Sequence, residues 1–461
     1  MILEEKSSLK RQLTSLKREV LLAVSISSFL VTSSMSSVGI AIPAIMRDLA
    51  MDASTSGWIL TTFLLATTVF LVPLGRIADI KGRKKLFVLG NIVFAVSSML
   101  CGFSSSSSMI IGMRVLQGIG GAMIFATGIA LISSVFHPKE RGRALGLYTS
   151  SAYMGLTIGP LLGGVLTEGF SWRSVFFFNA PIGGLVIILT LLKLREEWIE
   201  AKGEKLDFIG SVVYGAMVTS VIIGLSQGYL VLIALGAILL GVFILWELKR
   251  RWPVLELRLF KNVTFAFSNF AALLNYSATY ASPFILSLYL QHLRGLSPQQ
   301  AGLVLTAQPA IQAIFSPSAG YLADKVEPRM VASIGMGLTA LGLWSLSHIE
   351  LETDITTIIF SLTLIGIGLA LFVSPNTKVI MSSTPSKFYG VASAMTATMR
   401  NLGQAISMSI ITLLMTLFLG KGTITEPSTY NLFVNCSQLA FQVFSALCVV
   451  GMLLSITRGK S

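Results

Sequence analysis

Charged residues are scarce in this chain of 461 residues: they make up 12% of it, whereas 53% of the residues are hydrophobic. This composition excludes an ordinary soluble globular protein, in which about 25% of the residues are charged. Basic residues outnumber acidic ones, 34 to 21, but they are scattered in short stretches between apolar runs. Because no soluble basic surface gathers them, nucleic acid is excluded as a partner. The composition indicates a polytopic membrane protein.

Cysteine and histidine are also rare, with three of each. We expect the three cysteines to be small core residues: Cys101, Cys436 and Cys448. Their spacing fits neither a disulfide framework nor a metal site. We expect the three histidines in loops: His137, His292 and His348. No nucleophile stands beside a base, and no glycine-rich phosphate loop follows a strand. The sequence therefore predicts no enzyme, no catalytic residues, no metal and no cofactor.

Long apolar runs, by contrast, are abundant. A run of about 20 apolar residues is long enough to cross the hydrocarbon layer as a helix. We identify fourteen such runs, near residues 20–46, 57–78, 86–104, 109–135, 144–167, 172–193, 206–226, 229–247, 265–291, 301–322, 330–348, 355–380, 390–419 and 433–457. The predicted fold class is an all-α polytopic membrane protein with 14 transmembrane spans.

The charge of the connecting loops gives these spans an orientation, because Lys and Arg accumulate in cytoplasmic loops. With the N-terminus in the cytoplasm, the external loops carry four basic residues: Arg47, Arg173, Arg294 and Lys421. A single missed span would exchange the sides of every later loop, so this lasting asymmetry supports the span count. We therefore expect a multi-pass protein of the cell membrane, in contact with its lipids, with both termini in the cytoplasm.

The first segment, residues 1–19, combines leucines at helical spacing with lysines and arginines. Two interpretations of it remain open. It is either a basic amphipathic helix on the inner leaflet or a basic tail that only sets the orientation. Both interpretations place it in the cytoplasm, together with a short C-terminal tail, residues 458–461.

An internal repeat organises the spans into domains. The segment GRIADIKGRKK (75–85) follows the second span and GYLADKVEPR (320–329) follows the tenth, so that Asp79 corresponds to Asp324. Spans 1–6 and 9–14 are then two related six-helix bundles with the same orientation, with two spans inserted between them. The predicted domains are an N-terminal bundle, a linker with the inserted spans and a C-terminal bundle: 20–193, 194–264 and 265–457. Two parallel bundles that rock against each other would enclose a substrate path.

The repeated segment has the composition of a conformational latch. Glycine allows close approach of helices, an aspartate can pair across the cytoplasmic face, and basic side chains can bridge to acidic groups or helix C-termini. The predicted latch residues are Gly75, Asp79, Gly82, Arg83, Lys84, Lys85 and, in the second copy, Asp324. Anchoring by positive charge alone is the alternative, but it explains neither the glycines nor the aspartate.

The fifth span contains GLTIGPLLGG, which has the composition of a gate. Its small residues let helix backbones touch, and its proline interrupts the hydrogen-bond ladder and bends the helix. The predicted gate residues are Gly155, Gly159, Pro160, Gly163 and Gly164. Tight packing alone is the alternative, and it is compatible with a gate.

Together these motifs resemble the major facilitator superfamily, specifically its fourteen-span drug:proton antiporter branch. The latch follows the pattern G-x-x-x-D-x-x-G-R-[RK]-[RK], and the gate matches the antiporter signature G-x-x-x-G-P-x-x-G-G in full. Further signature stretches lie at 114–122, 171–183, 206–210, 288–302 and 400–406. The resemblance implies twelve core helices in two bundles, two accessory helices, alternating access, and export of amphipathic compounds driven by proton entry.

One departure from that branch concerns the first span. Its members typically carry an aspartate there, whereas the corresponding residue here is Ser34. All Asp and Glu residues fall in loops or at span ends, so no mid-membrane carboxylate is available to bind a cation or carry a proton. The sequence therefore places in doubt both roles that the resemblance implies for such an acid.

The span interiors contain arginine instead. Arg114 lies in the fourth span and Arg400 in the thirteenth. A charge at the bilayer centre costs about 2.5–3.5 kcal/mol on insertion scales, so neither residue should face lipid. Each either gives the cavity a positive potential or joins helices through hydrogen bonds.

Polar and aromatic side chains at helical spacing form the candidate substrate cavity: Thr32, Ser34, Ser36, Gln117, Asn275, Tyr276, Tyr280, Gln308 and Gln312. A stripe of hydroxyls also serves simply to join helices, and this alternative stays open. As a set, these residues describe a mostly apolar cavity with scattered hydrogen-bonding groups, which suits amphipathic small molecules.

The sequence thus predicts a secondary active transporter that exports hydrophobic or amphipathic compounds by alternating access, in antiport with protons. One alternative is a facilitator or exporter of neutral or anionic solutes without proton coupling. The other is a non-transporting membrane receptor or scaffold.

Overall fold

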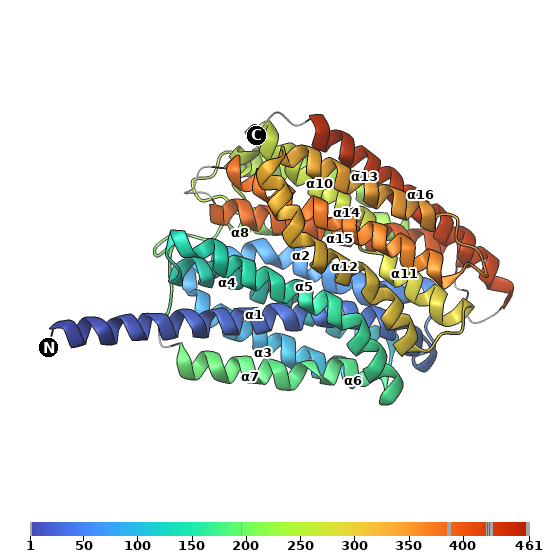
Figure 1. The fold of residues 1–461 in the computed structure, drawn as a ribbon, viewed down its shortest axis with the longest axis horizontal. Helices are drawn as coiled ribbons and strands as arrows, with labels where there is room; N and C mark the ends of the chain where they lie inside the picture. The colour runs from blue at the N-terminus through green and yellow to red at the C-terminus, as the bar shows by residue number, and fades with distance from the viewer. Residues whose placement is uncertain are drawn as a thin grey trace.

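The computed structural model describes residues 2–194, 196–384, 389–420, 422, 424 and 427–457, with the side chains of 2–14, 138, 139, 142, 389, 390, 427 and 428 left out. The regular structure in these ranges is helical (Figure 1). The first helices are α1 (Ile2–Asp48), α2 (Ala53–Lys81), α3 (Arg83–Gly102), α4 (Ser107–Val135), α5 (Pro138–Gly169), α6 (Trp172–Phe177) and α7 (Asn179–Lys193). Next come α8 (Phe208–Gln227), α9 (Leu230–Glu247) and the 3-10 turn η1 (Leu257–Lys261). The last are α10 (Val263–Thr279), α11 (Ser282–Leu288), the π-helical turn η2 (Tyr289–Leu293), α12 (Pro298–Lys325), α13 (Pro328–Leu346), α14 (Ile355–Ser382), α15 (Tyr389–Leu419) and α16 (Pro427–Thr457).

Each predicted span overlaps one of these helices, but the sixth and ninth spans are interrupted. The sixth is divided into α6 and α7, and the ninth into α10, α11 and η2. Pro181 and Pro283 explain the interruptions, because proline cannot donate a hydrogen bond to the carbonyl four residues earlier. At the second interruption the Ala281 N–H donates instead to the hydroxyl of Ser407, at 3.0 Å.

Eleven helical segments of the described chain are long and apolar enough to cross a membrane. The three predicted spans outside this group are α5, α12 and the interrupted α10–α11. Helix α10 has only 17 residues, and α5 and α12 are rich in Gly, Ser, Gln and Pro. These helices also have protein neighbours on several sides: α5 packs against α1 and α12, α12 against α14, and α10 against α15 and α16.

Helices distant in sequence lie side by side. Helix α1 packs against α4, α5 and α7, and α4 packs against α2 and α3, while α14 packs against α12 and α13 (Figure 1). We refer to α1–α7 as the N-terminal helices and to α10–α16 as the C-terminal helices. The two sets meet chiefly where α5 packs on α12 and α2 packs on α15. Helix α8 packs on α9 and also touches both α2 and α15.

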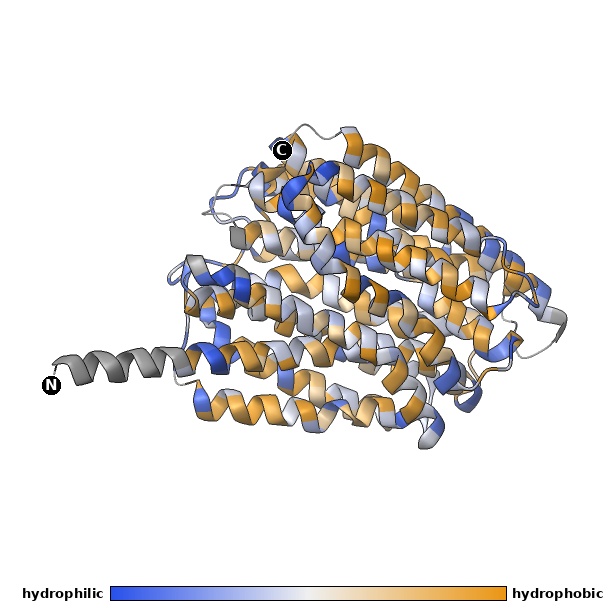
Figure 2. Ribbon diagram, viewed as in Figure 1, coloured by the Kyte–Doolittle hydropathy of each residue, from blue (hydrophilic) through white to orange (hydrophobic). Residues whose placement is uncertain are grey.

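The outer surface of the bundle is apolar, whereas hydrophilic residues gather mainly at its two ends (Figure 2). Leu192, Leu230 and Leu417 are examples of large apolar side chains that are 69%, 78% and 69% exposed. Such a surface is stable against lipid rather than water. We call the end where α2 meets α3 and α4 meets α5 the basic face, after Arg83 and Arg141, and the other end the opposite face.

Two sequence predictions lie largely outside the described side chains. Helix α1 begins at Ile2 and runs without a break to Asp48. The basic amphipathic character expected for residues 1–19 rests mostly on side chains that are not described, and the tail 458–461 is not described either.

Candidate functional site

A cavity lies between the N-terminal and C-terminal helices. It encloses about 950 Å³ of empty space, part of it open to solvent, and α1, α5, α10 and α12 supply most of its wall. The wall is mostly apolar and aromatic. Its polar side chains, besides tyrosines, are Ser36, Thr279, Gln308, Gln312 and Gln404. Among the described residues, no Asp, Glu, Lys or Arg lines it.

Five of the nine residues predicted for a substrate cavity line this one: Ser36, Tyr276, Tyr280, Gln308 and Gln312. Gln308 is only 8% exposed, and its Oε1 atom has no hydrogen-bond partner in the described chain. The Oε1 atom of Gln404 is also buried without a described partner. Gln404 and Tyr153 were not predicted, although Gln404 belongs to the signature stretch RNLGQAI, one turn beyond Arg400.

Two other predicted cavity residues face away from the cavity, toward neighbouring helices. The Ser34 hydroxyl accepts a hydrogen bond from the Asn179 side chain of α7, at 3.1 Å. The Thr32 hydroxyl donates to the backbone carbonyl of Ser28 at 2.8 Å. Both residues are buried between helices. The position at which relatives typically hold an acid thus lies at the contact between α1 and α7.

The remaining two predicted cavity residues, Gln117 and Asn275, are completely buried. Gln117 donates to the Ser98 hydroxyl at 2.6 Å. Asn275 is adjacent to Tyr276 in sequence, and neither polar atom of its amide group has a hydrogen-bond partner in the described chain. Neither residue lines the cavity.

The hydroxyl-rich side of α1 packs against the gate glycines of α5. The Ser37 hydroxyl donates to the Gly159 carbonyl at 2.9 Å, and the Ser36 hydroxyl to the Gly155 carbonyl at 3.3 Å. A Cβ atom on Gly159 would overlap Ser36, and one on Gly163 would lie 2.5 Å from the Ser37 carbonyl oxygen. The hydroxyl stripe therefore joins two helices, and Ser36 also reaches the cavity.

The remaining gate positions contact the C-terminal helices. The Pro160 carbonyl lies so close to Gly302 of α12 that a side chain on Gly302 would overlap it. A Cβ atom on Gly164 would lie 2.6 Å from the Pro298 carbonyl oxygen at the start of α12. The gate motif thus joins α1, α5 and α12 in one contact toward the opposite face.

Four hydrogen-bonded pairs that join N-terminal to C-terminal helices in the described chain lie toward the opposite face. These pairs are Glu168 with Gln299, Ile40 with Gln291, Ser54 with Gly420 and Ala53 with Gly422. A further side-chain hydrogen bond, between Tyr153 of α5 and Tyr276 of α10, joins the two sets at the cavity wall. Hydrogen bonding between the two sets is therefore concentrated toward the opposite face.

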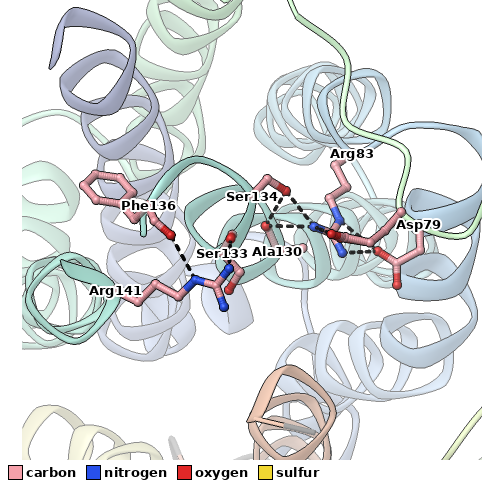
Figure 3. Close-up of polar contacts among 8 residues, drawn as sticks. Asp79, Arg83, Ala130, Ser133, Ser134, Phe136 and Arg141 are labelled. Carbon is pink, nitrogen blue, oxygen red and sulfur yellow. Dashed lines mark hydrogen bonds and ion pairs between the residues drawn. The ribbon is translucent and has the colours of Figure 1, made fainter. Parts of the chain in front are cut away.

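The predicted latch forms a network within the N-terminal helices. Arg83 is 8% exposed, and its Nε atom donates to the Asp79 carboxylate at 2.8 Å. A second nitrogen donates to the Ser134 hydroxyl at 2.6 Å and the Ala130 carbonyl at 3.2 Å on α4 (Figure 3). The same nitrogen lies 3.0 Å from the Glu200 carboxylate. Arg83 thus joins α2, α3 and the last turns of α4.

A second arginine, which the sequence analysis missed, also binds the end of α4. Arg141 donates to the carbonyls of Ser133, at 2.6 Å, and Phe136, at 3.0 Å (Figure 3). Cations at a helix C-terminus pair with its unsatisfied carbonyls and its dipole. Two guanidinium groups therefore hold this helix end.

The linker after α7 completes the latch. Gly82 has a φ of 124°, which favours glycine, and a Cβ there would lie 2.6 Å from the Glu197 carboxylate. Glu197 accepts hydrogen bonds from the backbone N–H groups of Lys84, at 2.8 Å, and Lys85, at 3.2 Å. At Gly75, by contrast, a Cβ would make only an ordinary contact with Ala126, at 3.8 Å.

The second copy of the latch has a simpler arrangement. Asp324 at the end of α12 pairs with Lys378 of α14. Lys378 also donates to the Ala323 carbonyl at 2.9 Å. The first copy thus joins α2 to α4, and the second copy joins α12 to α14 in the corresponding way.

Arg114 is completely buried within the N-terminal helices. Its Nε atom donates to the Ile59 carbonyl at 2.9 Å, another nitrogen donates to Gln117, and the guanidinium lies 4.3 Å from the centre of the Phe63 ring. This is the geometry that the helix-joining interpretation requires.

We therefore expect Arg114→Lys to destabilise the protein nearly as much as Arg114→Met. Lysine cannot reproduce the planar set of donors, so buried acceptors lose their partners, at a cost of about 1–3 kcal/mol each. The measurement is thermal unfolding of the purified protein, with the exposed Arg143→Met as the control. A lysine variant as stable as the unchanged protein would rule out this role.

Arg400 has different surroundings. It is partly exposed and makes no hydrogen bond or ion pair with any described residue. Its charge nevertheless acts on the phenol groups of Tyr148, Tyr153 and Tyr276. Since Tyr153 and Tyr276 line the cavity, Arg400 places an uncompensated positive charge beside it.

Comparison of the sequence with known proteins finds one family and several transporters. Residues 24–246 and 266–460 match the sequence model of the Major Facilitator Superfamily. The chain is 28% identical over 448 residues to the riboflavin transporter RibZ of Clostridioides difficile, covering 95% of this chain and 96% of that one. It is 30% identical over 401 residues to the multidrug resistance protein Stp of Mycobacterium tuberculosis, covering 85% and 74%. The multidrug export protein EmrB of Escherichia coli is 28% identical over 406 residues, covering 86% and 79%.

Solved structures support the same fold. A bacterial homologue of the human lysosomal transporter Spinster, in an inward-facing and unoccupied conformation, superposes with a TM-score of 0.71 at 15% identity. That match covers 96% of this chain and 97% of the other. The nucleoside transporter NupG gives a TM-score of 0.65 at 14% identity, covering 96% and 100%.

Proposed function

We propose that this chain, which belongs to the Major Facilitator Superfamily, exports hydrophobic or amphipathic small molecules by alternating access. Membership of this family and the transporter relatives make it an integral membrane transporter rather than an enzyme. The observation that carries the proposal is the cavity between the N-terminal and C-terminal helices, next to which hydrogen bonds join the two sets chiefly toward the opposite face. A receptor or scaffold has no use for such a cavity between two sets of helices.

The proposed architecture has fourteen spans in two six-helix bundles, with α8 and α9 inserted between them. Loop charge orients the basic face toward the cytoplasm, with both termini on that side. The structure then represents a form that is closed to the outside and receives substrate from the cytoplasm. Rocking of the bundles would separate α5 from α12 and release the substrate outside.

The mostly apolar wall supports amphipathic substrates, because such a surface accepts varied rings and chains while a few polar groups orient them. The relatives Stp and EmrB are named as multidrug resistance and export proteins, and RibZ as a riboflavin transporter. From EmrB we carry over export, and from all three the transport or resistance role toward organic small molecules, without a specific compound.

Proton coupling is part of the proposal, and His292 is its candidate proton-binding group. We expected this residue in a loop, but it lies in the π-helical turn η2 near the opposite face. In this form the His292 ring is buried near the positive charge of Arg47, which disfavours its protonated state. Opening of this face to water would remove that burial. Protonation therefore favours the outward-open form.

We expect acidification from pH 7.5 to pH 5 to increase the outward-open population, by at most about tenfold per pH unit. The measurement is the distance between spin labels at Thr55 on α2 and Leu417 on α15. His292→Gln should make the distance distribution independent of pH over this range. The same pH response in both proteins would eliminate His292 as the sensor.

A second candidate function is transport of neutral or anionic solutes without proton coupling. The absence of any carboxylate from the described cavity wall favours it. Flux of cationic, neutral and anionic dyes in proteoliposomes under an imposed pH gradient separates the two candidates. Antiport predicts flux that rises with the gradient and falls when a protonophore collapses it. Saturable flux unaffected by the gradient supports the second candidate, and no saturable flux of any dye refutes both.

A further inference from the structure

The cavity has positive charge beside it and no acidic counterpart. Arg400 does not line the cavity itself, but it lies on α15 one helical turn before the lining residue Gln404. Its charge acts on Tyr153 and Tyr276 of the wall, and no described carboxylate pairs with it. Arg114 is completely buried and its charge acts on the phenol of Tyr280, and it has no acidic partner among the described residues either. In a region of low dielectric constant, such charges attract anions and repel cations over several ångströms.

The wall also holds unused hydrogen-bond acceptors. The Oε1 atoms of Gln308 and Gln404 are buried and have no described partner, and Gln308 is more than nine-tenths buried. Buried polar atoms are normally satisfied, so these oxygens indicate a ligand that supplies N–H or O–H groups. On α15, Gln404 lies one helical turn from Arg400, on the same side of the helix.

Aromatic side chains complete the surroundings. Tyr153, Tyr276, Tyr280 and Phe284 line the cavity. Tyr153 comes from α5 and the other three come from α10, α11 and the break between them, so that both sets of helices contribute rings. Flat faces of this kind stack on planar ring systems. The combination of rings, two acceptors and an adjacent guanidinium is more specific than a general apolar cavity.

We propose that the cavity binds planar aromatic acids in their anionic form. The anionic group lies at Arg400, the ring system lies among Tyr153, Tyr276 and Phe284, and a donor on the ligand reaches Gln308 or Gln404. A guanidinium binds carboxylate or sulfonate oxygens through two parallel N–H groups, which fixes the orientation of the ligand. This inference rests on the proposed export function and names its substrate class.

The test uses the purified full-length protein and three probes that share one ring system. Naphthalene-2-sulfonate is an anion, naphthalene-2-sulfonamide is neutral, and 2-naphthylmethylammonium is a cation. We expect the anion to bind at least about tenfold more tightly than the other two in calorimetric titrations at pH 7.5. This comparison needs no variant, so it remains decisive even if a substitution at Arg400 impairs folding.

Variants of Arg400 then test whether this residue causes the preference for the anion. Arg400→Gln should weaken sulfonate binding to the level of the sulfonamide while leaving sulfonamide binding unchanged. Arg400→Lys should keep part of the preference, because it retains the charge but loses the paired donors. The exposed Arg143→Gln is the matched control and should bind like the unchanged protein. Equal binding of the three probes, tightest binding of the cation, or an anion preference that survives in Arg400→Gln would overturn the proposal.

A flux measurement separates this inference from the export proposal. Sulfonate stays ionised and does not cross the bilayer unaided, so its movement into proteoliposomes reports transport. Binding with an anion preference but without flux of any probe would refute export and leave the site in place. Saturable flux of all three probes without an anion preference would refute the site and leave export in place.

Discussion

Replacement of Gly164 with leucine is expected to reduce substrate flux by about tenfold or more while the protein still folds. A Cβ at this position would lie 2.6 Å from the Pro298 carbonyl oxygen, so closure of α5 on α12 becomes strained. Overpacking typically costs about 1–3 kcal/mol, and each 1.4 kcal/mol shifts an equilibrium about tenfold. The strain exists only in the form closed at the opposite face, so the variant should remain in the outward-open form.

Two glycines of the same helix provide controls for this experiment. A Cβ on Gly169 would meet no atom within 4 Å, so Gly169→Leu should transport normally. A Cβ on Gly163 would meet the Ser37 carbonyl of α1, within the N-terminal helices. Gly163→Leu should therefore lower the thermal stability itself. Flux and unfolding temperature are measured for all three variants in parallel, and normal flux through Gly164→Leu would show that α5 and α12 need not close.

Arg83→Ala is expected to impair transport and to lower stability by about 2–3 kcal/mol, since hydrogen bonds to charged groups are lost. Its guanidinium binds the Asp79 and Glu200 carboxylates and the end of α4. Its removal leaves the two carboxylates close to each other without the cation that binds both of them. Asp79→Asn should have a smaller effect, because an amide oxygen still accepts from Arg83.

Lys85→Ala is the matched control for the latch. Lys85 is exposed and contributes only its backbone N–H to the network, so both flux and stability should be retained. Arg83→Lys should resemble Arg83→Ala, because a single ammonium group cannot reach α2, α4 and the linker together. Proteoliposome flux and thermal unfolding are the measurements. A fully active Arg83→Ala protein would show that the network is dispensable.

The positions of the helices could be predicted from hydropathy, because lipid imposes long apolar runs. The interruptions at Pro181 and Pro283 could not, since proline is also tolerated inside a continuous helix, as at Pro43 and Pro160. At the second interruption the Ala281 N–H bonds to Ser407, a contact that hydropathy does not reveal. The same reasoning explains α5 and α12, which are rich in small and polar residues and in proline, and the short α10. They line the cavity, so part of their surface never meets lipid.

The site was only partly predictable, because helical spacing shows which residues share a face but not which neighbour that face meets. Ser34 and Ser36 belong to one hydroxyl-rich segment, yet Ser34 contacts α7 and Ser36 reaches the cavity. The latch motif likewise gave Arg83 and Asp79, whereas Glu197 comes from the linker after α7 and Arg141 from the first turn of α5, and neither belongs to a repeated motif. Contacts made by loops depend on chain paths that local sequence does not specify.

Helix α8 has a consequence for the route by which lipid-dissolved molecules approach. The Tyr214 hydroxyl of α8 donates to the Thr68 carbonyl of α2 at 3.1 Å, and the Ser409 hydroxyl of α15 donates to the Ile222 carbonyl of α8 at 3.3 Å. Helix α8 is therefore fastened across the seam between α2 and α15. A compound dissolved in the bilayer cannot pass between α2 and α15 into the protein without displacing α8. For such a compound, the other contact between the two sets of helices, where α5 meets α12, is the available route from the lipid.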